Sequence, residues 1–254
     1  SVSKIWEGGG TYTPPVTVYV YSDGTVVATL TLAEPSWSAT VSVKPHDATG
    51  HYYTFTVVED PVPTGYTVSY SPGQIVAPSA SYAFTVTNKL ERTEQTATKS
   101  WVGGDNLSRP AISFQLLRKS STETLYTAYT ARVALDGVVD TVCTDVPCGY
   151  EYAAWQVKWI ELDPTDDSGN PYTYSVAEIY GGSTLVDGTT FGTAGNQYIV
   201  TYNEMTVTNT YKVENTTVKV TKSWLDATGE EMTTNIPSTL DVTLTDGTNS
   251  YPYT

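Results

Sequence analysis

The sequence predicts an all-β protein made of tandem immunoglobulin-like β-sandwich domains arranged end to end. Thr, Val and Tyr are abundant, whereas only 2 Met and 4 Phe occur among the 254 residues. Short β-branched runs are bounded by turn signals such as Asp23-Gly24 and Asp136-Gly137, and no window shows sustained helical periodicity. The third observation is an internal repeat, which also sets the number of domains.

Each repeat opens with a strand in which a Lys precedes a Trp by two positions. This pattern occurs three times, at Lys4, Lys99 and Lys222. A unit of about 90 to 120 residues is large enough for one two-sheet core. We therefore expect a domain at 1–90, a second domain with an insertion at 94–212, and the N-terminal part of a third, truncated domain at 217–254.

The strands of the first two repeats follow from short alternating or apolar runs. In the first repeat we expect strands at 2–6, 15–21, 26–32, 55–59 and 84–88. In the second repeat we expect strands at 97–101, 112–117, 174–178, 198–202 and 205–209. The second repeat is the longer one, and we expect its extra residues between Asp140 and Pro171.

The repeated Lys points into the predicted core. Because side chains alternate along a strand, each Lys shares a face with its Trp and with a small or apolar residue two positions earlier. An isolated ammonium in an apolar interior must lose its proton or find a partner. The repeat should therefore supply a group that answers this charge.

Two further strands of each repeat carry a polar side chain on an apolar face. The pattern Tyr/Phe-x-Val-x-Glu ends at Glu59 in the first repeat and at Glu178 in the second. The pattern Val-Thr-Asn ends at Asn88 and at Asn209. Each of these repeats thus aims one Lys, one Glu and one Asn at its core, whereas Lys222 has no matching strands within the chain.

Two explanations of this set are open. A buried ion pair between Lys and Glu, completed by Asn, can fix strand register. Alternatively, burial lowers the pKa of the Lys and raises that of the Glu. A neutral amine can then attack the Asn carboxamide, while a protonated Glu binds the amide oxygen and passes a proton to the departing ammonia.

The ordered set resembles the B-type repeats of Gram-positive surface adhesins and pilins, often called Cna protein B-type domains. The matching features are the opening Lys-x-Trp, a Pro before the next strand, the Tyr/Phe-x-Val-x-Glu strand and the closing Thr-Val-Thr-Asn. The resemblance implies an autocatalytic isopeptide bond between Lys4 and Asn88, assisted by Glu59.

In the second repeat the resemblance implies the same bond between Lys99 and Asn209, assisted by Glu178, and it leaves Lys222 as an unpartnered crosslink lysine. Such domains form stalks of cell-wall-anchored adhesins and shafts of pili, so the implied location is extracellular. The implied chemistry is one self-crosslinking event per site, without a cofactor and without enzymatic turnover.

Charge and hydropathy exclude several partners. The chain has 27 acidic and 13 basic residues, which gives a formal net charge of −14. Nucleic acid and anionic lipid both need a cationic surface, so we expect neither. No apolar run is long enough to cross a bilayer, so we expect no membrane insertion of this segment. The expected partners are neighbouring domains of the same surface protein.

The two cysteines, Cys143 and Cys148, flank four residues that include a Pro. Two separate thiols are one interpretation, but this spacing easily closes a small disulfide ring, which we favour. A disulfide would imply an oxidising compartment.

The competing hypothesis is a ligand-binding adhesin region that recognises a host matrix protein or glycan. Exposed tyrosines can form such a surface. We expect it first in the insertion, with Tyr150, Tyr152, Trp155 and Trp159.

Two polar segments have the composition of metal sites without the spacing. His46 and His51 flank Asp47, and the loop 163–170 is acidic, but neither matches a known metal-binding pattern. We expect no metal site.

Overall fold

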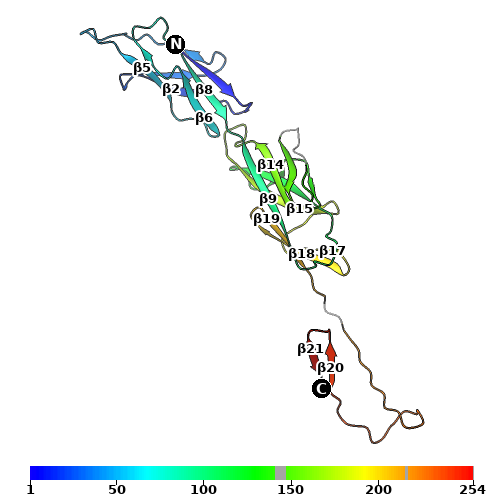
Figure 1. Ribbon diagram of the computed structural model, residues 1–254. Helices are drawn as coiled ribbons and strands as arrows, with labels where there is room; N and C mark the ends of the chain where they lie inside the picture. The colour runs from blue at the N-terminus through cyan, green and yellow to red at the C-terminus, as the bar shows by residue number, and fades with distance from the viewer. Residues whose placement is uncertain (141–146, 215–216, 254) are drawn as a thin grey trace. The chain divides into compact units, whose positions relative to one another are not determined.

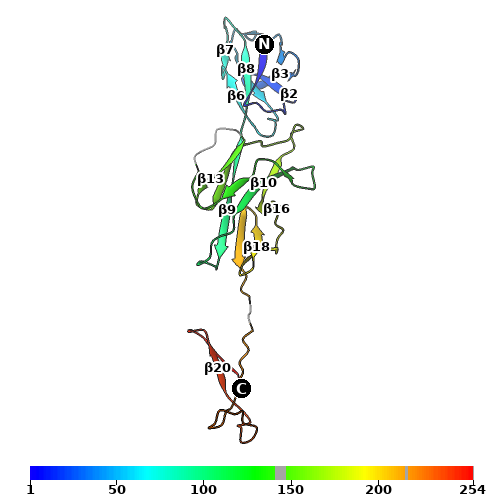
Figure 2. The same ribbon diagram turned by 90° about the vertical axis from the view of Figure 1, so that its right-hand side faces the viewer.

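The computed structural model describes residues 1–140, 147–214 and 217–253. The chain divides into two compact units, Ser1–Lys212 and Val213–Thr254. The first unit contains two hydrophobic cores, each enclosed by two β-sheets (Figures 1 and 2). The described residues form strands and no helix, so the predicted all-β class is confirmed. We call strands β1 to β8 the first sandwich and strands β9 to β19 the second sandwich.

The first sandwich has two four-stranded sheets. One sheet runs in the order β4 (Ser38–Ala39), β1 (Val2–Glu7), β8 (Phe84–Leu90) and β6 (Tyr66–Ser71). The other runs in the order β3 (Thr25–Leu32), β2 (Val16–Ser22), β5 (Thr54–Glu59) and β7 (Ile75–Val76). The first and last strands, β1 and β8, are parallel neighbours, with Lys4 opposite Val86 and Trp6 opposite Asn88.

The second sandwich has a larger first sheet. Its order is β13 (Cys148–Ala153), β14 (Gln156–Leu162), β9 (Thr93–Val102), β19 (Thr206–Tyr211), β18 (Asn196–Asn203) and β17 (Thr190–Thr193). The other sheet contains β11 (Thr127–Ala128), β10 (Ile112–Ser120), β15 (Tyr172–Tyr180) and β16 (Ser183–Thr184), and β12 (Val133–Leu135) also pairs with β10. Again the first and last strands, β9 and β19, are parallel neighbours.

The extra residues of the second sandwich lie mainly before β14. Strand β14 takes the place of β4, because each pairs antiparallel with the first strand of its sandwich. Strand β13 has no counterpart in the first sandwich and extends the sheet beyond β14. A smaller addition lies between β10 and β12. In the first sandwich the single strand β3 pairs along β2, whereas in the second sandwich two short strands, β11 and β12, pair with β10. The expected position, between Asp140 and Pro171, is therefore right only for the larger part.

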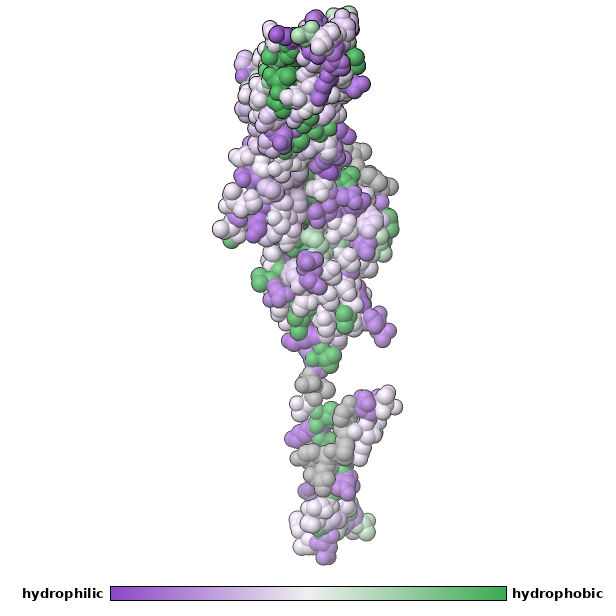
Figure 3. Space-filling view, turned by 90° about the vertical axis from the view of Figure 1, so that its left-hand side faces the viewer, coloured by the Kyte–Doolittle hydropathy of each residue, from purple (hydrophilic) through white to green (hydrophobic). Residues whose placement is uncertain are grey.

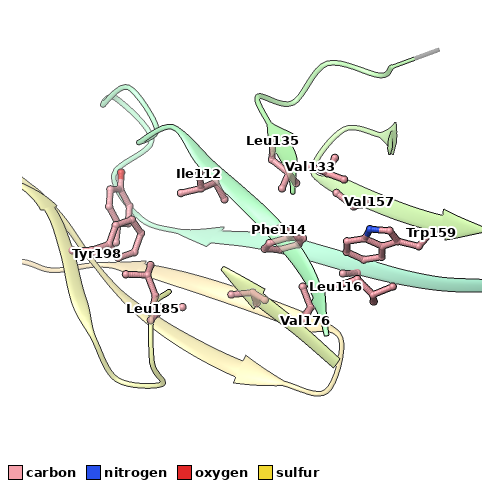
Figure 4. Packing of buried hydrophobic residues seen from close by; sticks show 14 of the residues in the cluster. Ile112, Phe114, Leu116, Val133, Leu135, Val157, Trp159, Val176, Leu185 and Tyr198 are labelled. Carbon is pink, nitrogen blue, oxygen red and sulfur yellow. The ribbon is translucent and has the colours of Figure 1, made fainter. Parts of the chain in front are cut away.

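The cores consist of the inward residues of facing strands. In β2, buried and half-buried residues alternate strictly over VTVYVYS, as a strand with one face on a core requires. The second core packs Phe114, Leu116 and Trp159 with no exposed surface (Figure 4). Burying an apolar side chain of this size contributes about 1.5 to 3 kcal/mol, so each core holds its two sheets together.

The second unit is sparsely packed. Its described residues form one two-stranded sheet, β20 (Val242–Thr245) with β21 (Ser250–Tyr253). Apolar side chains such as Val218 and Leu225 are exposed there. An isolated hairpin is marginally stable in water, because it cannot bury enough apolar surface. The predicted domains 1–90, 94–212 and 217–254, and their end-to-end arrangement, stay predictions.

One face of the chain carries mainly hydrophilic residues and residues of intermediate hydropathy (Figure 3). Figure 3 shows hydrophilic residues spread over the face in view, with hydrophobic residues in scattered patches. Among the described residues no helix is both long and apolar enough to span a membrane.

Candidate functional site

Each sandwich buries one Lys, one Glu and one Asn between its sheets. Charged side chains are almost never fully buried without a partner, so these are the most informative polar residues of the two cores. The exposed fractions are Lys4 6%, Glu59 2% and Asn88 0% in the first sandwich, and Lys99 4%, Glu178 0% and Asn209 0% in the second.

The topology brings the three side chains together from three strands. Lys4 of β1 lies opposite Val86 of β8, and Asn88 follows two residues later on the same face of that strand. Diagonal neighbours of this kind on adjacent strands lie within reach of long side chains. Glu59 comes from β5, in the opposite sheet, and reaches the pair across the core.

In the first site the carboxylate bridges the amine and the amide. Lys4 Nζ lies 3.3 Å from Glu59 Oε2. The angles of a hydrogen bond are not met in that contact, and Lys4 Nζ donates instead to the carbonyl of Ile5 at 3.5 Å. Asn88 Nδ2 donates to the other oxygen, Glu59 Oε1, at 2.6 Å.

The second site repeats this geometry. Lys99 Nζ donates to Glu178 Oε2 at 3.3 Å and to the carbonyl of Val207 at 3.3 Å. Asn209 Nδ2 donates to Glu178 Oε1 at 2.7 Å. Two sequences that differ at most positions thus converge on the same three-group contact.

The carboxylate contacts the amide nitrogen, which differs from the sequence-based expectation that it binds the amide oxygen. Asn88 Oδ1 and Asn209 Oδ1 are buried and accept no hydrogen bond. Leaving a buried acceptor unsatisfied costs about 1 to 3 kcal/mol. The contact places the acid beside the group that would depart in an aminolysis.

Aromatic rings line the lysine on one side. Lys4 Nζ lies 4.4 Å from the centroid of the Trp6 ring, and Lys99 Nζ lies 4.7 Å from that of Trp101. This is the contact that the Lys-x-Trp pattern predicts, because residues two apart share a strand face.

Two tyrosines that the sequence analysis missed hold the glutamates. The backbone N–H of Glu59 donates to Tyr70 Oη at 3.0 Å, and that of Glu178 donates to Tyr202 Oη at 3.0 Å. A signal was present in the sequence, because Tyr-x-Val-Ser/Thr-Tyr ends at these two residues in both repeats. Its first tyrosine packs edge-on against the site Trp, at 4.9 Å in the first sandwich and 5.0 Å in the second.

Burial shifts the titration of the site groups. Desolvation lowers the pKa of Lys99 to about 8, although the neighbouring Glu178 acts in the opposite direction. Desolvation likewise lowers the pKa of Lys4 and raises that of Glu178. Both shifts favour the neutral forms, an amine and a carboxylic acid, which are the forms that an aminolysis of the amide needs.

The sequence also singles out Lys222 and the two cysteines. Lys222 of the second unit lies over the Trp224 ring at 4.8 Å. Cys143 lies outside the described residues, so the disulfide with Cys148 stays a prediction.

Two aspartates of the polar segments, Asp47 and Asp166, close local turns. Asp47 Oδ1 accepts the backbone N–H of Thr49 and of His51, and His51 also contacts Asp23 at 2.9 Å. In the acidic loop, Asp166 closes its own turn in the same way.

Among the described residues of the insertion, the four aromatic side chains expected at a ligand surface do not lie together on the surface. Trp159 is fully buried in the second core, and Trp155 packs against Trp101 at 5.6 Å. Only Tyr152 of the expected group is exposed. These tryptophans are therefore occupied by the core and by the buried site.

A family model matches part of the chain. Residues 1–89 match the Cna protein B-type domain, which confirms the resemblance for the first sandwich. A comparison with curated proteins gives no match.

Several solved structures are similar to the chain. A single B repeat unit (B1) of the collagen-binding surface protein of Staphylococcus aureus is 24% identical, with 84% of this chain and 97% of that chain covered and a TM-score of 0.28. The pilus adhesin SpaC of Lactobacillus rhamnosus GG is 16% identical, with 83% and 28% covered and a TM-score of 0.31. The major pilin T3.2 of Streptococcus pyogenes is 12% identical, with 83% and 96% covered and a TM-score of 0.35. At these TM-scores no conclusion about activity or assembly follows.

The lowered pKa of Lys99 can be measured in a variant that keeps the amine free. In Asn209→Ala we expect the pKa of Lys99 to be about 8, because the lysine stays buried. Between pH 8 and about 10.4 the unfolded chain then binds a proton that the folded chain has lost, so the free energy of unfolding rises with pH. Carbon-13 NMR of the lysine ε-carbons follows the titration, and the same sample in urea is the control. A native midpoint near 10.4 would contradict this expectation.

Proposed function

We propose that residues 1–212 are a structural segment of a bacterial cell-surface adhesin or pilus, in which isopeptide bonds join Lys4 to Asn88 and Lys99 to Asn209. The observation that carries the proposal is the duplication of the site, with a carboxylate bridging amine and amide at nearly equal distances in both sandwiches. The proposed domains are 1–90 and 94–212, with the start of a third at 217–254.

The proposed reaction is an intramolecular aminolysis that occurs once at each site. The Glu carboxylate takes a proton from the Lys ammonium, and the neutral Nζ attacks the Asn carboxamide carbon. The Glu then gives this proton to Nδ2 and takes the second proton from Nζ, the C–Nδ2 bond breaks, and ammonia leaves, so the Glu ends protonated. An amine and a primary amide thus become a secondary amide and ammonia, with no oxidant, metal or cofactor in the balance. The fold supplies the acceleration by holding the reactants in contact.

The position of the bond suits a mechanical role. Each bond would join the first strand of a sandwich to the last, because Lys4 lies in β1 and Asn88 in β8. Tension that enters at one end would cross through this covalent bridge to the other end. The hydrogen bonds of the intervening strands would then carry no load.

A location outside the cell and partners among neighbouring domains belong to the same proposal. They are supported by the match of residues 1–89 to the Cna protein B-type domain. Binding of a host matrix protein or glycan is not proposed, because Trp159 is buried in the second core and Trp155 is half-buried and packs against Trp101.

Intact mass tests the crosslinks directly. We expect the mass of the chain to be lower than its sequence mass by two ammonia molecules. The first two repeats each contain a Lys, a Glu and an Asn at the site, whereas Lys222 has no matching Glu and Asn. Peptide mapping should find Lys4 joined to Asn88 and Lys99 joined to Asn209. An unchanged mass with free lysines at both sites would refute the proposed function.

Removal of one glutamate should leave a folded sandwich without its bond. In Glu59→Ala the loop from Lys4 to Asn88, 85 residues long, is no longer closed covalently. The chain-entropy relation for disulfides puts the lost stability at roughly 4 to 5 kcal/mol, so the first sandwich should melt earlier.

The second sandwich is the matched control for Glu59→Ala, since Glu178 is intact and one ammonia should still be lost. Differential scanning calorimetry and intact mass measure the two effects. Bond formation at the normal rate in Glu59→Ala would show that this acid has no part in the reaction.

Single-molecule pulling tests the mechanical role. The wild-type chain should show no extension of the length of either sandwich, because the load passes through the bonds. Lys4→Ala should restore one such extension, for the first sandwich alone, and Lys99→Ala one for the second. Two full extensions in the wild-type chain would rule out the shielding of the strands.

A further inference from the structure

We propose that Trp37 and Trp155, which we call the lid tryptophans, are positioning residues for the crosslinking reaction in the first and second sandwich. Each fixes the backbone of the reacting lysine and closes the aromatic wall of its site against water. This inference rests on the proposed function and adds residues to that same site. Trp37 and Trp155 occupy equivalent positions in the two sandwiches, which the sequence pattern did not reveal.

Both lid tryptophans have a backbone conformation that bulky residues rarely adopt. Their φ angles are 48° at Trp37 and 62° at Trp155. A left-handed conformation is costly for such residues and persists only where the surrounding structure determines it, often at functional sites. The same unusual conformation therefore occurs at the same place in two sandwiches of different length.

The conformation aims a carbonyl at the reacting strand. The backbone N–H of Lys4 donates to the carbonyl of Trp37 at 2.7 Å, and that of Lys99 donates to the carbonyl of Trp155 at 2.8 Å. Each lid tryptophan thereby fixes the backbone of the lysine itself. A shift of about 1 Å in a reacting group can cost on the order of 100-fold in rate, so this anchor bears directly on the chemistry.

The lid rings continue the aromatic wall. The Trp37 ring packs edge-on against Trp6, with centroids 5.6 Å apart and planes at 75°. The Trp155 ring packs against Trp101 in the same way, at 5.6 Å and 77°. The lysine amine lies over Trp6 or Trp101, so each lid ring contacts the same ring that the amine contacts.

The two sandwiches hold their lids by different means. The N–H of Trp37 donates to the carbonyl of Ala33 at 2.9 Å. The N–H of Trp155 donates instead to Glu151, a carboxylate that is 1% exposed, at 2.6 Å. Gly137 passes so close that an added Cβ would lie 3.0 Å from the Trp155 indole nitrogen. Different groups thus hold Trp37 and Trp155 in the same position. This indicates that both sandwiches require the position of the lid tryptophan, and not a particular local sequence.

Closure of the wall matters because the amine must be neutral to react. Burial is the main cause of the lowered pKa of Lys99, so water admitted beside Trp101 would return that pKa toward its ordinary value. The charged group beside this amine is Glu178 of β15, and the Arg109 guanidinium lies 5.1 Å from the Trp101 ring centroid. Tyr202 of β18 is the titratable group that holds the Glu178 backbone.

The test follows ammonia loss in a chain that carries Lys4→Ala, so that only the second site can react. This parent chain and its variants are made by cell-free translation, quenched in acid at timed points and weighed intact at pH values from 6 to 10. Trp155→Gly removes the ring, while glycine still adopts the left-handed backbone without strain. Trp159→Phe is the matched control, because Trp159 is buried in the same core but pairs with Gln95, away from Lys99.

We expect Trp155→Gly to react at least about 10-fold more slowly than the parent at pH 7. A return of the amine pKa from about 8 to about 10.4 would lower its neutral fraction at pH 7 by roughly 200-fold, which sets the upper bound. The midpoint of the pH profile should move upward, so that the rate recovers at high pH. Trp159→Phe should keep the rate and the midpoint of the parent.

Several outcomes would overturn the proposal. A Trp155→Gly rate within about threefold of the parent, or a slower rate with an unmoved midpoint, would mean that Trp155 is only structural. Trp155→Phe, with its smaller ring, should move the midpoint to a lesser extent, and an unmoved midpoint in that folded variant decides the case where the glycine variant does not fold. A parent chain that loses no ammonia would refute the proposed function, whereas a reactive parent with indifferent lid variants would refute the lid alone.

Discussion

The burial of a lysine beside a glutamate is the constraint on which both sandwiches depend. A charge cannot enter an apolar core without an answering group, and here the answer comes from the opposite sheet, at 3.3 Å in each case. The packing of the core, the register of the strands and the aromatic rings around the site must all be compatible with this Lys–Glu contact. Loss of either partner would leave the other buried alone, which is the costlier state, so the pair fixes which faces of the two sheets meet.

The duplicated shell shows how much of each sandwich serves this pair. A tyrosine hydroxyl holds the glutamate strand, a tryptophan carbonyl holds the lysine strand, and a tryptophan ring lies under the amine in both copies. Elsewhere the copies diverge freely. The second adds β13, divides the counterpart of β3 into two short strands and supports its lid with Glu151. The two sandwiches share the contacts around the buried Lys, Glu and Asn but differ elsewhere. Shared ancestry of the fold alone would not restrict the similarity to the site in this way.

The alternation of apolar and polar residues along short segments made most of the strands predictable. It also predicted the burial of the Lys, Glu and Asn side chains of the two sites. Alternation assigns a face to each residue, so Lys4, Glu59 and Asn88 could be placed in one core from the sequence alone. Long-range geometry was not predictable in this way. Trp37 lies in a short edge segment without alternation, and only the pairing of β4 with β1 brings it to the lysine. Which amide atom faces the glutamate depends on a side-chain rotation, which leaves no trace in a strand pattern. Trp159 was misjudged because aromatic composition does not reveal which face of a strand is buried.

The parallel pairing of the first and last strands has a consequence for biogenesis. Strand β8 completes its sheet only after every other strand of the first sandwich has been made, so Lys4 and Asn88 cannot meet in a partly synthesised or partly exported chain. Contacts of such high sequence separation form late in folding. A covalent link between these strands would therefore record that folding had been completed. Until then the polypeptide would have no covalent link between its first and last strands.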